Sequence, residues 1–184
     1  MTRFKTASFL CAGALTLAAA QPAAAQALVR DGAHDFDFSP GIWHTHVRRI
    51  LDPLSGGTHV REMDGTVTTR AVWGGRAWLE EIEADGQSGH WEGMTIFLYN
   101  PQSHQWGQSY AGSDDGQIST TTGAFHDGVG DFYATDTYEG RQVLVRGTWS
   151  GITADAHDYT IAYSDDGGKS WHPAFIAHKT RIHA

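Results

Sequence analysis

A few ionisable side chains stand in segments that are otherwise rich in Val, Thr, Tyr, Phe and Trp, and these residues could bind or transform a small molecule. Arg49 and Arg146 each offer a guanidinium, whose fork of N–H donors suits a carboxylate or another polar ligand group. Glu80 and His178 are candidates for general acid–base chemistry, since burial raises the pKa of a carboxyl group and lowers that of an imidazole. An alternative for Arg49 is a structural salt bridge to Glu80 or Glu92.

Aromatic side chains supply the other ingredient of a binding pocket. His104, Trp106, Gln108 and Tyr110 occupy every second position, so one face of a strand would present two aromatic rings and an amide. Tyr99 precedes them and could extend the same wall. Ligand pockets combine apolar or aromatic walls with a few polar groups. We therefore expect these residues to line a pocket, with ordinary core filling as the alternative.

Metal and haem binding have less support. His44 and His46 could chelate a metal from one face of a strand. Strand alternation places them opposite Trp43, however, and no third ligand follows at a recognisable spacing, so we expect no metal site. Haem held by a single histidine is an alternative to the expectation of no cofactor. The histidines available for it are His126, His172 and His178.

Motifs for covalent catalysis and nucleotide binding are absent from the sequence. There is no G-x-S-x-G elbow, and the single cysteine, Cys11, falls in the leader described below. The glycine pairs follow strand-like segments with no helix behind them, so the phosphate site of a helix N-terminus is missing.

The elements that must position these residues are short strands. Runs rich in Thr, Val, Tyr, Phe and Trp alternate with Gly, Asp and Asn clusters, and no apolar repeat of helical period is sustained. The predicted strands are 41–51, 58–70, 76–83, 90–99, 104–111, 117–125, 130–138, 141–150, 157–163 and 172–181. Tight turns between them indicate an antiparallel meander, and closing it removes both exposed edges. We expect an all-β, single antiparallel up-and-down β-barrel of about 8–10 strands with room for one small ligand.

Residues 164–171, S-D-D-G-G-K-S-W, match the Asp-box hairpin known from sialidase propellers. In this motif Asp166 caps the turn backbone, Gly168 allows a positive φ and Trp171 packs on the hairpin stem. The motif occurs once, whereas a propeller needs repeated four-stranded blades. We interpret it as a structural turn.

The first 25 residues predict a cleaved signal peptide, with Arg3 and Lys5 before an apolar stretch and Ala23–Ala25 at the cleavage site. Residues 26–34 are then a flexible N-terminal segment and 35–184 the barrel domain. Loss of the leader leaves 11 Lys+Arg against 21 Asp+Glu, a formal charge of −10. This balance disfavours nucleic acid as a partner, and no later stretch is long and apolar enough for membrane insertion.

The motif D-F-D-F-x-x-G-x-W at 35–43, the Asp-box hairpin and the terminal Arg181 occur in an order that resembles a bacterial family of uncharacterised lipocalin-like proteins. The resemblance implies a calycin-type barrel in which Trp43, on the first strand, plugs one end. It also implies that Arg181, on the last strand, lies across the Trp43 indole. It supplies no reaction, cofactor or catalytic residue. The chain departs from the family pattern at His178 and Lys179.

Together these observations predict a secreted, periplasmic barrel that binds a small, partly apolar ligand in its lumen. Arg49 or Arg146 would meet the polar end of the ligand, and Tyr99, Trp106 and Tyr110 would form the wall. The alternative is a small cofactor-free enzyme (a lyase, isomerase, cyclase or hydrolase) that uses an interior His or carboxylate. An interaction module with an apolar outer face is a third option, and a homodimer is left open.

Overall fold

The computed structural model describes residues 30–114 and 116–183, and ten strands account for most of them. The predicted signal peptide (1–25) and Cys11 lie outside the described residues. The strands are β1 (Gly41–Ile50), β2 (Val60–Val72), β3 (Ala77–Gly86), β4 (Gly89–Asn100), β5 (Gln105–Gly112), β6 (Ile118–His126), β7 (Val129–Tyr138), β8 (Arg141–Ser150), β9 (Ala156–Ser164) and β10 (His172–Arg181). Each predicted strand is present, so the prediction of an all-β fold is confirmed.

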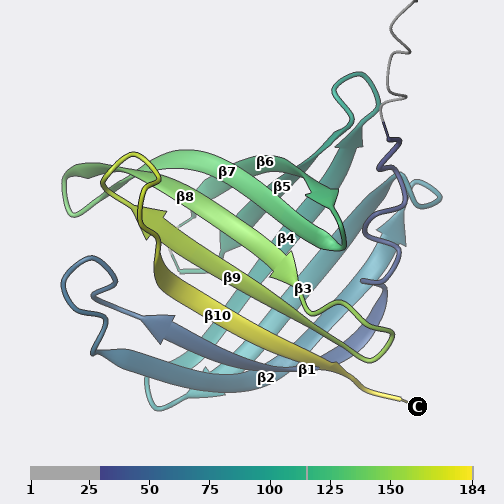
Figure 1. Cartoon of the computed structure of the whole chain (residues 1–184). Helices are drawn as coiled ribbons and strands as arrows, with labels where there is room; N and C mark the ends of the chain where they lie inside the picture. Colours follow the sequence, from purple (N-terminus) through teal and green to yellow (C-terminus); the bar gives the residue numbers. More distant parts are fainter. Residues whose placement is uncertain (1–29, 115, 184) are drawn as a thin grey trace, which may run out of the picture.

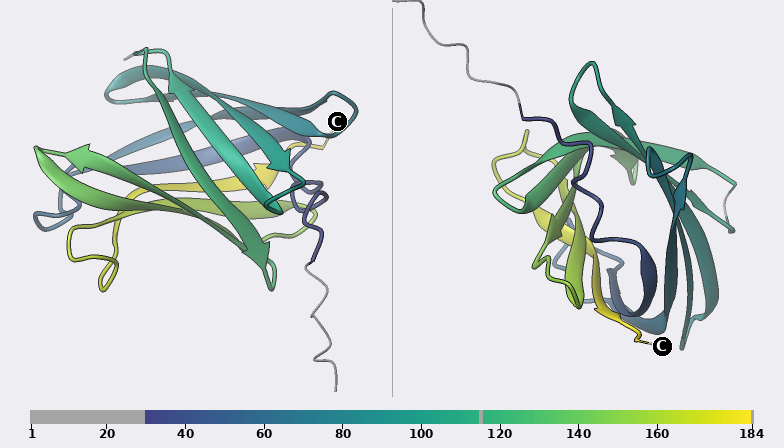
Figure 2. Two further views of the ribbon diagram at one scale, coloured as in Figure 1. Left: turned by 90° about the horizontal axis from the view of Figure 1, so that it is seen from above. Right: turned by 90° about the vertical axis from the view of Figure 1, so that its right-hand side faces the viewer.

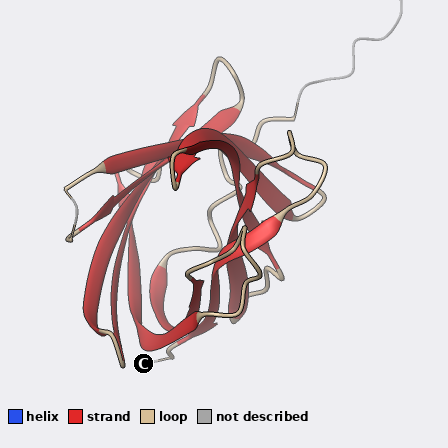
Figure 3. Ribbon diagram, turned by 90° about the vertical axis from the view of Figure 1, so that its left-hand side faces the viewer, coloured by secondary structure: helices blue, strands red, loops and turns tan. Residues whose placement is uncertain are grey.

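The strands form one closed antiparallel barrel of up-and-down topology (Figure 1). Each strand pairs with the next in sequence, and β1 pairs with β10 to close the ring. Viewed from the end at the left of Figure 1, the strands surround a central space (Figure 3). Side chains alternate between lumen and outer face, which buries Trp43, Thr45 and Val47 on β1 and exposes His44 on the other side.

One end of the barrel is closed by the segment that precedes β1, which crosses it as seen from the right of Figure 1 (Figure 2, right). Phe36 is fully buried there and packs against Phe97, Trp106, Phe125 and Trp149, with ring centroids 4.5–5.5 Å away. Edge-to-face and tilted contacts of this kind are favourable beyond the area they bury. We call this cluster the aromatic plug.

Side chains at this end of the barrel donate hydrogen bonds to the same segment, two indoles to backbone carbonyls and a tyrosine to a carboxylate. Trp106 donates its indole N–H to Gly32, at 2.8 Å, and Trp43 donates to Ser39, at 2.9 Å. The Tyr99 hydroxyl donates to Asp31, at 2.8 Å. Residues 31 and 32, within the segment expected to be flexible, are therefore bonded to the barrel.

The contact between the first and last strands is the one implied by the family resemblance. The Arg181 guanidinium lies 3.9 Å from the centroid of the Trp43 ring and donates to the carbonyls of Phe38, Pro40 and Ala154. This one side chain ties the last strand both to β1 and to the plug segment.

The Asp-box hairpin joins β9 to β10 and is a turn held by its own side chains. Asp166 accepts hydrogen bonds from the backbone N–H groups of Lys169 and Ser170 and from the hydroxyls of Ser164 and Ser170. These bonds, led by those from Ser170, lower the pKa of the Asp166 carboxyl. Gly168 has φ +88°.

The described surface carries histidines paired to carboxylates, as in His46 with Asp64 and His90 with Asp85. It also exposes large apolar side chains, including Trp73, Ile118 and a strip of Met94, Ile96 and Leu98 on β4. Within residues 30–114 and 116–183 no helix has the length and hydropathy of a membrane span.

Candidate ligand-binding cavity

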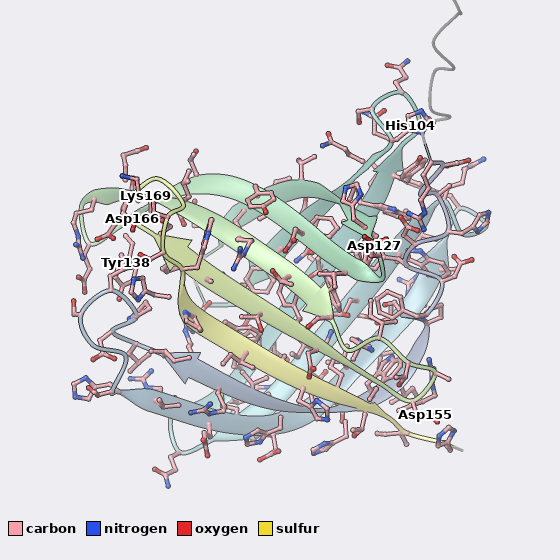
Figure 4. All side chains as sticks on the ribbon, viewed as in Figure 1. His104, Asp127, Tyr138, Asp155, Asp166 and Lys169 are labelled. Carbon is pink, nitrogen blue, oxygen red and sulfur yellow. The ribbon has the colours of Figure 1, made fainter. Side chains whose placement is uncertain are left out.

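A cavity of about 620 Å³ occupies the half of the barrel away from the aromatic plug. Figure 4 marks the two ends: Tyr138 and Asp166 lie at the end with the cavity mouth, whereas His104 and Asp127 lie at the plugged end. Apolar and aromatic side chains from all ten strands form most of its wall. They include Met63, Ile82, Trp91, Val145, Ile161, Phe175 and Ala177. The volume suits one small molecule.

Two glycines explain why aromatic residues in the wall leave the lumen open. A Cβ at Gly93 on β4 would lie 2.7 Å from the Tyr110 ring, and a Cβ at Gly147 on β8 would collide with Tyr159. Each ring thus lies flat over a glycine on the neighbouring strand instead of projecting across the lumen. The tyrosines line the cavity without filling it.

The inner boundary of the cavity, which we call the floor, contains a buried ion pair. The Lys179 amine on β10 lies 2.8 Å from Oε2 of Glu80 on β3, and the two residues are 2% and 7% exposed. Thr69 donates to the same carboxylate oxygen, at 3.4 Å, and the amine lies 4.8 Å from the Trp149 ring centroid. A buried charge is tolerated only when it is paired, so each partner requires the other.

A chain of hydrogen bonds forms the second polar element of the floor. Trp149 donates its indole N–H to the Gln108 side-chain carbonyl, at 3.1 Å, and the Gln108 amide donates to the Tyr159 hydroxyl, at 2.6 Å. Burial raises the pKa of Tyr159, so the phenol is neutral. Because Tyr159 accepts from Gln108, its own hydrogen is left to donate, and no described residue accepts it.

Polar side chains also ring the mouth. Arg49 and Asp136 lie there near Tyr163, whose pKa is raised mainly by burial and also by Asp136, with Arg49 acting the other way. Tyr138 packs against Tyr163 in a tilted arrangement, with centroids 5.3 Å apart, and donates its hydroxyl to the Leu51 carbonyl, at 2.7 Å. Since β1 and β7 are not neighbours in the ring, this bond links two separate parts of the rim.

The structure brings three of the predicted ligand-binding residues to the cavity. Arg49, Glu80 and Tyr110 all border it. The alternative salt bridge from Arg49 to Glu80 is not formed, because Glu80 pairs with Lys179. Tyr99 and Trp106 point to the interior but pack against each other at the plugged end, 5.2 Å between centroids, and do not border the cavity.

The other two predicted ligand-binding residues lie on the outer face, which corrects their assignment to the lumen. The Arg146 guanidinium lies 4.4 Å from the ring centroid of Trp171, on the Asp-box hairpin, because Trp149 takes the inward parity on β8. The exposed His178 ring bonds to Asp158, at 2.6 Å, since the neighbouring inward positions of β10 belong to Ala177 and Lys179.

Lys179 and Tyr159 are functional candidates that the sequence reasoning missed. Both could have been found from strand alternation: Lys179 is two residues from Arg181, which was expected to contact the interior Trp43. Tyr159 shares the inward face of β9 with Ile161 and Tyr163, and all three residues border the cavity.

The histidines of the described chain do not border the cavity. His157 is interior, but it packs between Trp43, Trp149 and Phe38 in the plugged half, and neither ring nitrogen has a hydrogen-bond partner. Burial, with Lys179 and Arg181 adding to it, lowers its pKa to about 3, so the imidazole is neutral. His126 and His172, the other candidates for a haem ligand, are exposed.

The described residues contain no group of three or more His, Cys, Asp or Glu side chains suited to a metal ion. His44 and His46 are both on the outer face and share the carboxylate of Asp64, at 3.6 and 2.9 Å. Their outward position is the one predicted from alternation.

Comparison with solved structures supports the fold. The chain is similar to the S-type phycobiliprotein lyase CPES from Guillardia theta, with a TM-score of 0.52 at 11% identity, covering 81% of this chain and 91% of that one. A structure of EF1p2_mFAP2b bound to DFHBI gives a TM-score of 0.46 at 8% identity, covering 82% and 99%. No protein-family model matches the chain, and no curated protein matches its sequence. The barrel has the fold of lipocalin-like, or calycin-like, proteins.

Proposed function

We propose that this protein binds one small, largely apolar molecule in the open half of its barrel. The observation that carries the proposal is the 620 Å³ cavity itself, which has apolar and aromatic walls, a mouth at one end and a small buried polar floor. Sites that bind small molecules combine these features. The other end is occupied by the aromatic plug, so the ligand enters and leaves through the mouth bordered by Arg49 and Tyr138.

Binding is favoured over catalysis by the state of the interior ionisable groups. An acid–base catalyst needs a carboxylate or imidazole that can exchange a proton with the substrate. Glu80 borders the cavity but is paired with Lys179, and the interior His157 is separated from the cavity by its place in the plugged half. His178, the other catalytic candidate, lies on the outer face.

We further propose that the barrel is exported to the periplasm after cleavage of residues 1–25. The basis is the charged, apolar and small-residue order of that segment. Mass spectrometry of the protein purified from the periplasmic fraction tests this, and recovery of the full-length chain from the cytoplasm would contradict it.

The binding proposal is tested with the neutral fluorescent probe N-phenyl-1-naphthylamine, which brightens in apolar surroundings. Wild-type protein is expected to bind it saturably. Ala134→Trp, which places a large ring at a position that borders the cavity, should weaken binding at least tenfold. Ala111→Trp, a matched change on the outer face of β5, should leave binding unchanged.

Thermal unfolding of both variants provides the control for folding. A wild-type protein that fails to bind the probe, or an Ala134→Trp variant that binds as well as wild type while still folded, would end the proposal of a ligand in the lumen.

A further inference from the structure

The charges that border the cavity cancel. Its lining contains two cationic side chains, Arg49 and Lys179, and two anionic ones, Glu80 and Asp136, with no histidine. A phenol is neutral at pH 7, and burial raises the pKa of Tyr138, Tyr159 and Tyr163 further from neutrality. A charged ligand would therefore enter a site without a net opposite charge.

The floor has no spare charge for an ionic ligand. A carboxylate that approached Lys179 would also approach the Glu80 carboxylate, whose Oε2 lies 2.8 Å from the amine, and an ammonium group that approached Glu80 would meet Lys179 in the same way. Removing an ion from water is unfavourable unless the site compensates it. At the mouth, Arg49 and Asp136 both border the cavity, so the mouth contributes one charge of each sign.

The floor can still form hydrogen bonds with a ligand, although its two charges are paired with each other. The Tyr159 hydroxyl hydrogen has no acceptor among the described residues, and the residue is 9% exposed. The bonds from Lys179 and Thr69 both end on Oε2 of Glu80, which leaves Oε1 to accept. A ligand hydroxyl, carbonyl or amide could use these groups without introducing a charge.

The net negative charge of the whole chain also disfavours anionic ligands. The chain carries 21 Asp+Glu against 13 Lys+Arg, a formal charge of −8 at pH 7. A negative field of this kind lowers the local concentration of anionic ligands at the mouth.

We propose that the cavity selects neutral amphipathic ligands, which place one hydroxyl, carbonyl or amide group at the Glu80–Lys179 pair and Tyr159 and an apolar body against the walls. The inference rests on the proposed binding function and adds the chemical class of the ligand. The ion pair is a specificity device: each member excludes the ionic ligand that the other alone would attract.

The test uses three ligands with the same apolar chain and different head groups, namely decan-1-ol, decanoate and decylammonium. Each displaces N-phenyl-1-naphthylamine at pH 7.5. Wild-type protein is expected to bind decan-1-ol at least tenfold more tightly than either ion. Glu80→Gln leaves Lys179 uncompensated and should improve decanoate relative to decan-1-ol at least tenfold. Lys179→Met should improve decylammonium instead.

The double variant Glu80→Gln/Lys179→Met is the matched control, because it removes both charges together and keeps the floor neutral. It should retain the preference for decan-1-ol over both ions. If a single variant does not fold, the wild-type ranking and the double variant decide the question.

Two kinds of failure are distinguishable. If the probe binds but decanoate or decylammonium displaces it as well as decan-1-ol does, or if the single variants keep the wild-type ranking, ligand selection by the ion pair is wrong and lumen binding stands. If neither the probe nor any of the three ligands binds, the proposed function itself is wrong.

Discussion

The two halves of this barrel use similar residues for different purposes. In the plugged half, Phe36 fills the lumen and the indole N–H groups of Trp43 and Trp106 bond to backbone carbonyls of the segment before β1. In the open half, Tyr110 and Tyr159 lie flat over glycines, and hydrogen-bonding groups face an unfilled space. Interior aromatic residues therefore identify a ligand site only where their neighbours leave room.

Substitutions in the two halves are expected to differ most in how far they lower the free energy of unfolding. Phe36→Ala removes the ring at the centre of the plug and should lower the free energy of unfolding by about 3 to 5 kcal/mol, measured by urea denaturation. Tyr163→Ala, which removes a half-buried ring at the mouth, should have less than half that effect. Equal losses would show that the plug is not the principal core.

The pH dependence of stability tests the plugged half again. The pKa of His157 is about 3 in the folded protein and near 6.5 when unfolded, so the unfolded chain binds the proton first as the pH falls. Stability is therefore complete above pH 6.5 and decreases between pH 6.5 and 3, by roughly 2 to 3 kcal/mol at pH 4.5. His157→Leu should remove this part of the decrease, and identical pH profiles for the two proteins would contradict the assignment.

Arg181 connects the plug segment with the last strand. Arg181→Met removes the contact with Trp43 and three hydrogen bonds, and should lower the free energy of unfolding by about 2 kcal/mol. Arg181→Lys keeps the charge but not the fork of donors, so its free energy of unfolding should lie between those of the wild type and the Arg181→Met variant. A Met variant as stable as wild type would show that β10 holds without this residue.

The smallest change in stability is expected at the mouth. Tyr138→Phe removes the hydrogen bond to the Leu51 carbonyl and should lower stability by less than about 1 kcal/mol. Release of N-phenyl-1-naphthylamine, followed by stopped-flow fluorescence, should become severalfold faster. Tyr163→Phe is the control, because the hydroxyl that it removes does not bond to Leu51. Equal release rates in the wild type and both variants would show that the Tyr138–Leu51 bond does not restrict the mouth.

The sequence predicted the fold well because the fold depends on local signals. Alternating side chains and Gly- or Asp-containing turns mark all ten strands, with ends within three residues of those observed. Alternation also placed Trp43 and Arg49 on the lumen side and His44 outside. Each of these predictions needs only the two-residue period of a strand.

Depth along the barrel is what this period does not encode. Trp106 and Tyr110 share a face of β5, yet four residues at about 3.3 Å each separate them by about 13 Å along the strand, enough to put one in the plug and the other beside the cavity. The burial of Lys179 depends on a partner 99 residues away, Glu80, which no local pattern specifies. The outward position of Arg146 likewise depends on the distant Trp171.

The most direct test of the account is amide NMR of the isotopically labelled protein titrated with decan-1-ol. The account predicts saturable shifts at the cavity floor and mouth, including Gln108, Tyr159 and Lys179, with little change around Phe36 and Trp106 in the plug. Shifts confined to the outer face, for example along Met94 to Leu98, or no shifts at any concentration would contradict the claim that the open half of the barrel is a ligand site.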